Sequence, residues 1–200
     1  TENSQGEIQQ AERKLIMKLS YEVRLLMAAT VKSVRLPNEC ELMKAIKSIG
    51  VAYNKISASG NIDVLPAMSK AFKNYYTAYP DDERAVHAYY YDAWAHYRMG
   101  KWRDASKVFE NLATNFPRSR YASEALFRAG DALFNMTNRG GSGDKGEAFL
   151  DAMAFYDRLV ERYPRSSHVD DALYNKAWCL INLERKEEAV PVFEQIVTDH

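Results

Sequence analysis

The histidines are the first residues to consider for chemistry, because an imidazole can act as a general base or bind a metal ion. The chain has four of them, His87, His96, His168 and His200. No two stand four residues apart on one predicted helix, and no HExxH or His-x-Glu element occurs. The sequence therefore indicates neither a catalytic histidine nor a histidine-based metal site.

A glycine-rich segment, GGSGDKG at residues 140–146, is the second candidate for chemistry. A phosphate-binding loop needs the order Gly-Lys-Ser/Thr after a strand, but here Gly146 follows Lys145 and no strand pattern precedes it. Its acidic residue, Asp144, has no alternating partners of the kind that a calcium loop requires. With no GxSxG motif either, we predict that the chain is not an enzyme and holds no cofactor or metal.

The two cysteines, Cys40 and Cys179, are interpreted as unpaired, partly buried thiols. A disulfide needs two Cα atoms within about 7 Å, which elements this far apart in a repeat array rarely provide. No cluster of Cys and His residues supplies a zinc site.

The elements that carry these residues repeat themselves from about residue 80 onward. Each repeat unit is a predicted pair of helices, and each helix carries one small residue at a fixed position. In the second helix an aromatic residue follows the small residue by four positions, and an aliphatic residue follows the aromatic one by three. A ring and a proline close each unit. The repeated positions are Ala93, Gly130 and Ala177; Ala105, Ala152 and Ala189; Phe109, Tyr156 and Phe193; Leu112, Leu159 and Ile196; and Tyr79-Pro80, Phe116-Pro117 and Tyr163-Pro164.

The spacing between units is consistent at every marker. Pro80 and Pro117 are 37 residues apart, whereas Pro117 and Pro164 are 47 apart. The extra ten residues lie near TNRGGSGDKGE, whose glycines predict a loop insertion between the two helices of the middle unit. We expect this loop, at 138–146, to be dispensable for folding.

These positions resemble the tetratricopeptide repeat family, strongly over residues 83–200 and weakly before them. The joints Pro117-Arg118-Ser119 and Pro164-Arg165-Ser166 resemble those of a longer-repeat subgroup found in bacterial envelope proteins, the outer-membrane assembly lipoprotein and the Tol–Pal system coordinator. The resemblance implies an all-α fold, a right-handed superhelical array of antiparallel helix hairpins. It also implies a protein partner and a place in the periplasm or at the outer membrane.

The expected organisation has three parts. Residues 1–37 form a polar tail and a long amphipathic helix over 7–33, which either caps the array or binds a partner. Residues 38–80 form a degenerate hairpin, and residues 81–200 form three repeats. The chain lacks an initial Met and stops one residue before the expected closing proline, so we interpret it as a fragment of a longer protein.

Composition narrows the range of partners. The 27 basic and 27 acidic residues cancel, which argues against nucleic acid as a partner. No apolar run approaches the roughly 20 residues of a transmembrane helix. A hydrophobic content of 46% is enough for a sizeable core in one elongated domain.

Candidate binding residues lie on the first helix of each unit, which in this family lines the concave groove. Aromatic and Arg side chains dominate many protein interfaces. We expect Tyr90, Phe127 and Tyr174 to belong to the core between units. The residues expected to face a partner segment are Trp94, Tyr97, Arg98, Asp131, Phe134, Asn135, Trp178 and Asn182.

Three functions remain open at this stage. The first is a non-enzymatic scaffold in a bacterial cell-envelope complex that binds a partner segment in the groove. The second is a cytoplasmic tetratricopeptide adaptor or regulatory domain of a larger protein. The third is glycan or peptidoglycan binding by the groove aromatics. The positions of the family's two-carboxylate clamp hold aromatic residues instead, so acidic chaperone C-termini are not expected as ligands.

Overall fold

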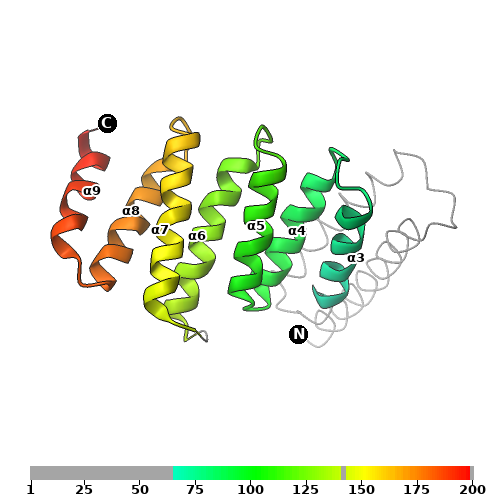
Figure 1. Ribbon diagram of the computed structural model, residues 1–200, viewed down its shortest axis with the longest axis horizontal. Helices are drawn as coiled ribbons and strands as arrows, with labels where there is room; N and C mark the ends of the chain where they lie inside the picture. The colour runs from blue at the N-terminus through cyan, green and yellow to red at the C-terminus, as the bar shows by residue number, and fades with distance from the viewer. Residues whose placement is uncertain (1–64, 141–142, 199–200) are drawn as a thin grey trace, which may run out of the picture. The chain divides into compact units, whose positions relative to one another are not determined.

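The computed structural model describes residues 65–140 and 143–198. The predicted helix over 7–33, most of the hairpin predicted over 38–80, and Cys40 lie outside these residues. Within the described ranges every regular element is an α-helix and no strand occurs, which confirms the all-α prediction (Figure 1). The helices are α3 (Leu65–Ala78), α4 (Ala85–Arg98), α5 (Trp102–Asn115), α6 (Ala122–Asn138), α7 (Lys145–Arg162), α8 (Val169–Asn182) and α9 (Lys186–Thr198).

The chain divides into two compact units, one through Met99 and one from Gly100. In the described part of the first unit, α3 packs against α4. Phe72 and Tyr75 of α3 are fully buried, and the ring of Tyr76 stacks on Tyr89 of α4 with centroids 3.8 Å apart. Aromatic residues on one face of α3 therefore hold this helix pair together.

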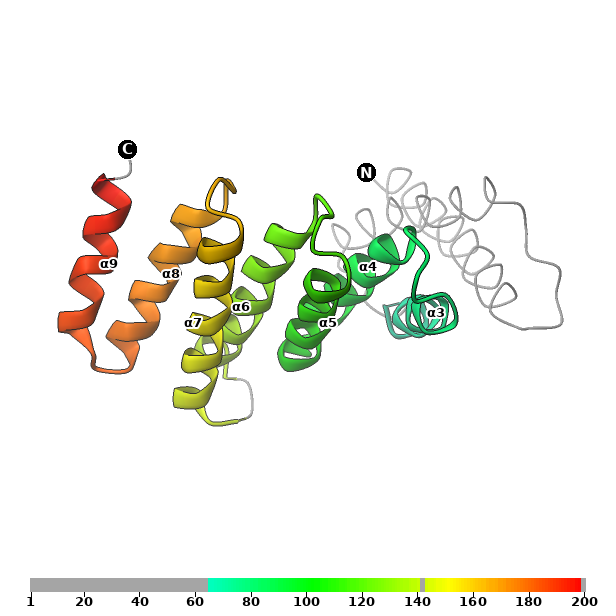
Figure 2. The ribbon, with the colours of Figure 1, turned by 45° about the horizontal axis from the view of Figure 1, so that its top comes forward.

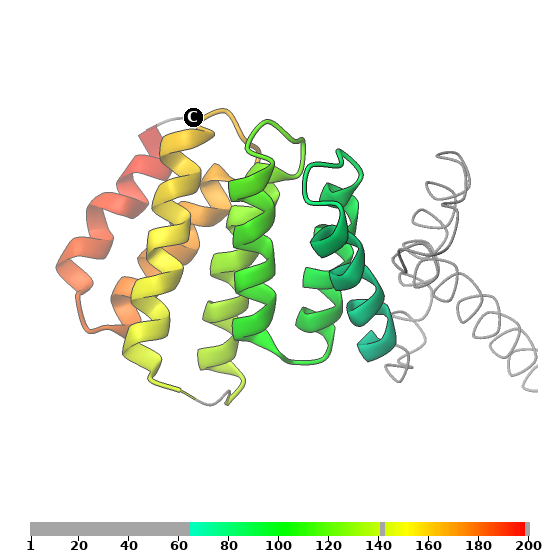
Figure 3. The ribbon, with the colours of Figure 1, turned by 45° about the vertical axis from the view of Figure 1, so that its right-hand side comes forward.

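The second unit contains α5 to α9, and each helix packs on the next. Consecutive helices run antiparallel and are joined by short connections (Figure 2). Helices α6 and α8 form one layer and α5 and α7 the other (Figure 3). The second unit is thus a two-layered stack of helix hairpins.

Small residues mark the helix crossings, as predicted. Ala105, Ala152 and Ala189 are all buried. Ala189 forms a core cluster with Ala177 and Leu180, and Phe193 packs against it. The predicted register of the repeats is therefore correct at these positions.

The joints between units use one hydrogen-bond pattern. In each joint the backbone N–H of an Asp or Ser donates to the carbonyl of the aromatic residue three positions earlier. The side-chain oxygen of that Asp or Ser then accepts from the backbone N–H two residues later, at the start of the next helix. The residues that fill the accepting position are Asp82, Ser119 and Ser166.

The ten-residue insertion in the middle unit is mainly helical, which corrects the prediction of a loop. Helix α6 has 17 residues and α7 has 18, whereas α5 and α8 have 14 each. Only three residues of the insertion lengthen the connection itself. The added helical turns bury Met136 and Ala148, so removing all ten residues would expose core surface, and the expectation that they are dispensable is not supported.

Candidate functional site

The candidate residues of the first unit lie on α4. The rings of Trp94 and Tyr97 meet edge to face with centroids 5.2 Å apart, and Tyr90 lies 6.3 Å from Trp94 in a similar geometry. Both Trp94 and Tyr97 are half-buried, and Arg98 at the end of the helix is exposed. The three predicted residues are adjacent and partly accessible.

The candidate residues on α6 form a polar surface with one ring beside it. The Asn135 amide donates to the Asp131 carbonyl oxygen at 2.8 Å and to the Asp131 carboxylate at 3.0 Å. The guanidinium of Arg128 lies 3.5 Å from the same carboxylate. Phe134 meets Phe149 of α7 edge to face at 6.0 Å, so it belongs partly to the core. Asp131 and Asn135 are therefore the polar members of this set, held in place by each other.

The candidate residues on α8 form an exposed row at intervals of four residues. Trp178 is 39% exposed, and the Asn182 amide donates to its backbone carbonyl at 2.7 Å. Tyr174, one turn earlier, lies 6.2 Å from Trp178 and is 50% exposed. The row Tyr174, Trp178 and Asn182, called here the α8 row, presents two large rings and an amide to solvent.

The exposure of Tyr174 contradicts the prediction that it belongs to the core between units. Its equivalent on α6, Phe127, is only 7% exposed. The imidazole of His168 stacks on Phe127 with centroids 5.2 Å apart and an interplanar angle of 6°. Tyr174 has a ring neighbour in Phe193, at 6.0 Å, but no stacked ring covers it among the described residues. His168 lies in the joint that follows the second helix of the repeat of Phe127, and the equivalent joint for Tyr174 would follow His200.

The structure brings together five of the eight predicted residues. Asp131, Phe134 and Asn135 stand on α6, and Trp178 and Asn182 stand on α8, which packs beside α6 in the same layer. Asp131 and Asn135 are the repeat equivalents of Trp178 and Asn182, 47 residues earlier. Trp94, Tyr97 and Arg98 belong to the other compact unit.

A buried polar cluster in the first unit went unnoticed in the sequence. The Asp92 carboxylate is fully buried and accepts a hydrogen bond of 2.8 Å from the Tyr76 hydroxyl. His96 Nε2 lies 3.4 Å from Asp92 and 3.1 Å from the hydroxyl of Ser69. Asp92 and His96, four residues apart on one helix, were the available signal.

The composition of this cluster suggests a Ser-His-Asp triad, but its geometry does not. In a triad the Ser and the Asp face opposite ring nitrogens, so that the imidazole can take a proton from one while the other orients it. Here Ser69 and Asp92 both face Nε2 of His96. The cluster therefore ties α3 to α4. Desolvation by burial raises the pKa of the Asp92 carboxyl above its ordinary value.

Other chemistry finds little support in the described part of the chain. No group of three or more His, Cys, Asp or Glu residues there could hold a metal ion. Cys179 is a free, buried thiol, and desolvation raises its pKa to about 12, which keeps it protonated and unreactive. In the same ranges no helix combines the length and apolarity needed to cross a membrane.

Antiparallel hairpins with repeated small and aromatic positions define a stacked-repeat protein. Two family models, each described as tetratricopeptide repeat, match residues 92–167 and 171–200. Tetratricopeptide repeats therefore make up these two segments of the chain. The repeats indicate a scaffold for protein–protein interaction.

Comparison with solved structures supports the fold. A structure of MamA AMB-1 is 14% identical with a TM-score of 0.55, over 94% of this chain and 92% of that chain. A structure of a MamA mutant is 16% identical with a TM-score of 0.52, over 94% of this chain and 98% of that chain. At these identities the likeness concerns the fold alone. No curated protein sequence matches the chain.

Proposed function

We propose that this protein is a non-catalytic scaffold in a bacterial cell-envelope complex and that it binds a segment of a partner protein on the layer formed by α6 and α8. The observation that carries the proposal is the α8 row. Tyr174 and Trp178 are 50% and 39% exposed, and their rings lie 6.2 Å apart on the same face of α8. Exposed Trp and Tyr side chains of this kind are typical interface anchors.

The neighbouring polar groups fit a peptide backbone. The Asp131 carboxylate is bound by Asn135 and Arg128, and each of its oxygens can accept a further hydrogen bond. Asn182 uses its amide nitrogen on the Trp178 carbonyl, so that its side-chain oxygen is the part left to accept. An extended segment could place apolar side chains on Tyr174 and Trp178 and direct its backbone N–H groups toward these oxygens. The combination of aromatic rings and hydrogen-bond acceptors favours a peptide segment as the ligand over a purely apolar molecule.

The envelope location rests on the resemblance of the Pro-Arg-Ser joints. Ser119 and Ser166 of these joints each accept a hydrogen bond from the backbone at the start of the next helix. The same geometry is made by Asp82 in the first unit, so the helix stack does not require serine there. We therefore treat the serine form as a mark of the subgroup and place the protein in the periplasm or at the outer membrane.

Site-specific photo-crosslinking tests the scaffold function directly. A photoreactive phenylalanine derivative replaces Trp178 in the full-length protein in its native cells, and crosslinked partners are identified after fractionation. We expect one dominant partner protein, recovered with the envelope fraction. The matched control places the same group at Leu150, which is 50% exposed, against 39% for Trp178, and lies on α7 in the other layer.

Three outcomes would contradict the proposal. Equal crosslinking from positions 178 and 150 would show that the α8 row has no preferred partner. A specific partner recovered only from the cytoplasm would support an adaptor and overturn the envelope location. Protection of position 178 by purified peptidoglycan fragments, without a protein partner, would point to glycan binding.

A further inference from the structure

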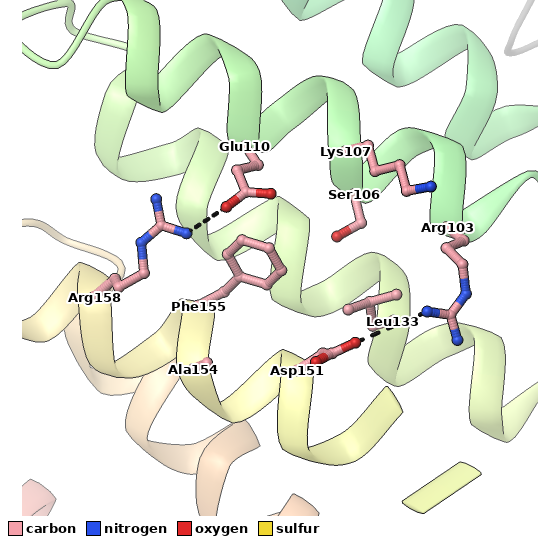
Figure 4. A pocket seen from close by; sticks show the side chains of 9 residues that line it. All are labelled: Arg103, Ser106, Lys107, Glu110, Leu133, Asp151, Ala154, Phe155 and Arg158. Carbon is pink, nitrogen blue, oxygen red and sulfur yellow. Dashed lines mark hydrogen bonds and ion pairs between the residues drawn. The ribbon is translucent and has the colours of Figure 1, made fainter. Parts of the chain in front are cut away.

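A second candidate binding surface lies in the other layer of the second unit. Helices α5 and α7 both pack on α6, and between them is a cavity of about 310 Å³ (Figure 4). Leu133 of α6 and Phe155 of α7, both buried, supply its apolar surface. The lining residues, called here the α5–α7 groove, are Arg103, Ser106, Lys107, Glu110, Leu133, Asp151, Ala154, Phe155 and Arg158.

Ion pairs between α5 and α7 span the groove at both ends, and they differ in length. At one end Arg158 of α7 contacts Glu110 of α5 at 2.6 Å. At the other end Arg103 lies 3.8 Å from Asp151 and 3.6 Å from Glu147, as Figure 4 shows for Asp151. Long pairs with water-exposed carboxylates contribute little to stability. Arg103 can therefore exchange these partners for an incoming carboxylate at little cost.

Lys107 adds a positive charge at the same end. It stands four residues after Arg103, on the same face of α5. No carboxylate within residues 65–140 and 143–198 lies within ion-pair distance of its ammonium group. The groove thus combines a small apolar floor with two cations, of which one is weakly paired and one has no acidic partner in these ranges.

The next groove along the stack shows that the fold does not require these cations. Repeat equivalents are 47 residues apart from α5 to α7 and from α6 to α8, and 37 apart from α7 to α9. Leu133 corresponds to Leu180, also buried, and the acidic Glu110 and Asp151 correspond to Asp157 and Glu188, also acidic. The three cations Arg103, Lys107 and Arg158 correspond to Leu150, Ala154 and Gln195. The floor and the acidic residues recur, whereas the positive charges are particular to the α5–α7 groove.

We propose that the α5–α7 groove binds an acidic peptide segment whose apolar side chain lies on Phe155 and Leu133 and whose carboxylates pair with Arg103 and Lys107. Charge complementarity selects this occupant, since the groove has three cations against two acidic residues. The cavity over this apolar floor has room for one or two side chains, and its volume is at the lower end of the range for ligand sites. The proposal rests on the scaffold function above and gives the scaffold a second contact, in the layer that does not carry the α8 row.

Fluorescence anisotropy with defined peptides tests this proposal on the full chain. The probe is a labelled decapeptide with a central Leu flanked by Asp and Glu; control peptides replace the acids with Lys or the Leu with Ala. We expect saturable binding of the probe, weakened about tenfold or more by raising salt from about 0.05 M to 0.5 M. Both control peptides should bind about tenfold more weakly than the probe.

Variants of the protein then locate the bound peptide. The double variant Arg103→Leu/Lys107→Ala gives α5 the residues of the next groove, and Lys107→Glu alone changes only an exposed side chain. Both should weaken probe binding about tenfold or more, whereas Lys186→Glu on α9, a charge-matched control outside the groove, should not.

Three outcomes would overturn the inference. They are the absence of saturable probe binding to the wild-type chain, binding unchanged in both groove variants, and binding lost in Trp178→Ala but retained in the groove variants. The last result would place the acidic segment on the α8 row, and so support the proposed scaffold function while removing the second surface. If the crosslinking test at position 178 fails while the groove still binds the probe, the result supports the α5–α7 groove and removes the α8 row as a binding surface.

Discussion

Gly130 of α6 lies directly against the ring of Tyr156 on α7. A Cβ atom at position 130 would stand 2.6 Å from Cε1 and 2.9 Å from Cζ of that ring. Tyr156 is fully buried, so the ring has no room to withdraw. The corresponding pair in the next unit is Ala177 and Phe193, where the ring lacks a hydroxyl group. Gly130 and Tyr156, whose ring follows Ala152 by four residues, therefore pack as one unit. The middle repeat needs glycine at position 130.

Replacing Gly130 with Ala should destabilise the protein although alanine is the better helix former. The Cβ forces the Tyr156 ring or the helix to move, which costs about 1–3 kcal/mol of unfolding free energy. Urea unfolding of Gly130→Ala, Tyr156→Phe and the double variant measures the coupling. The double variant, which copies the pair of the next unit, should be more stable than the sum of the single changes predicts. Simple additivity would show that the two residues are not in contact.

Ala152→Leu should overpack the crossing of α7 with its neighbours. Ala152 is fully buried, so three extra carbon atoms must displace close-packed groups, at a cost of about 1–3 kcal/mol. Ala154, two residues further on, is exposed and provides the matched control. In thermal unfolding Ala154→Leu should stay close to wild type while Ala152→Leu melts lower. Equal melting temperatures would contradict the repeat register.

Asp144→Ala should weaken the start of α7. The Asp144 carboxylate accepts hydrogen bonds from the backbone N–H groups of Gly146, at 2.7 Å, and Glu147, at 3.2 Å. Losing such an N-cap costs about 0.5–2 kcal/mol. Glu161→Ala, which removes an exposed carboxylate near the other end of the helix, is the control. Hydrogen exchange should show faster opening of the first turn of α7 in Asp144→Ala only; protection equal to wild type would rule out the cap.

Asp92 should make stability depend on pH in a defined direction. Burial raises its pKa in the folded protein above the value of about 3.9 in an unfolded chain. The folded state therefore holds the proton more tightly, and the stabilisation from this group is lost as pH rises through the folded pKa. Compared with Asp92→Asn, the wild type should lose unfolding free energy as the pH rises above about 4.

Urea unfolding of both proteins across this range measures the difference. His96, Ser69, Tyr76 and Lys73 lie near Asp92 and are present in both proteins. A difference between the proteins that is constant with pH, or that grows in favour of the wild type as pH rises, would contradict a raised pKa.

The helical fold and its register could be predicted from the sequence because they depend on local spacing. An aromatic residue follows each of the small residues Ala105, Ala152 and Ala189 by four positions. A helix pair can bury the alanine and the aromatic ring together in only one register. The ten-residue insertion was misread because its glycines dominate the composition. Seven of the ten residues nevertheless extend α6 and α7, where the apolar Met136 and Ala148 continue the buried face.

The candidate site was predictable only in part, because exposure depends on long-range contacts. Trp178 follows from its position on the first helix of a repeat. Tyr174 does not, since His168 covers Phe127 from the following joint and the equivalent joint for Tyr174 would follow His200. The cations of the α5–α7 groove were equally hidden, because Arg103 and Arg158 are 55 residues apart in the sequence.

The central claim is that the α8 row anchors a partner segment, and titration of the crosslinked segment tests it most directly. The segment, made as a labelled peptide, is titrated with the wild type, Trp178→Ala and the exposed-residue control Leu150→Ala. We predict that Trp178→Ala weakens binding about 30-fold, equivalent to about 2 kcal/mol, with a melting temperature within about 2 °C of wild type. Leu150→Ala should bind like the wild type. Unchanged affinity in Trp178→Ala, or a loss matched by Leu150→Ala, would contradict the claim.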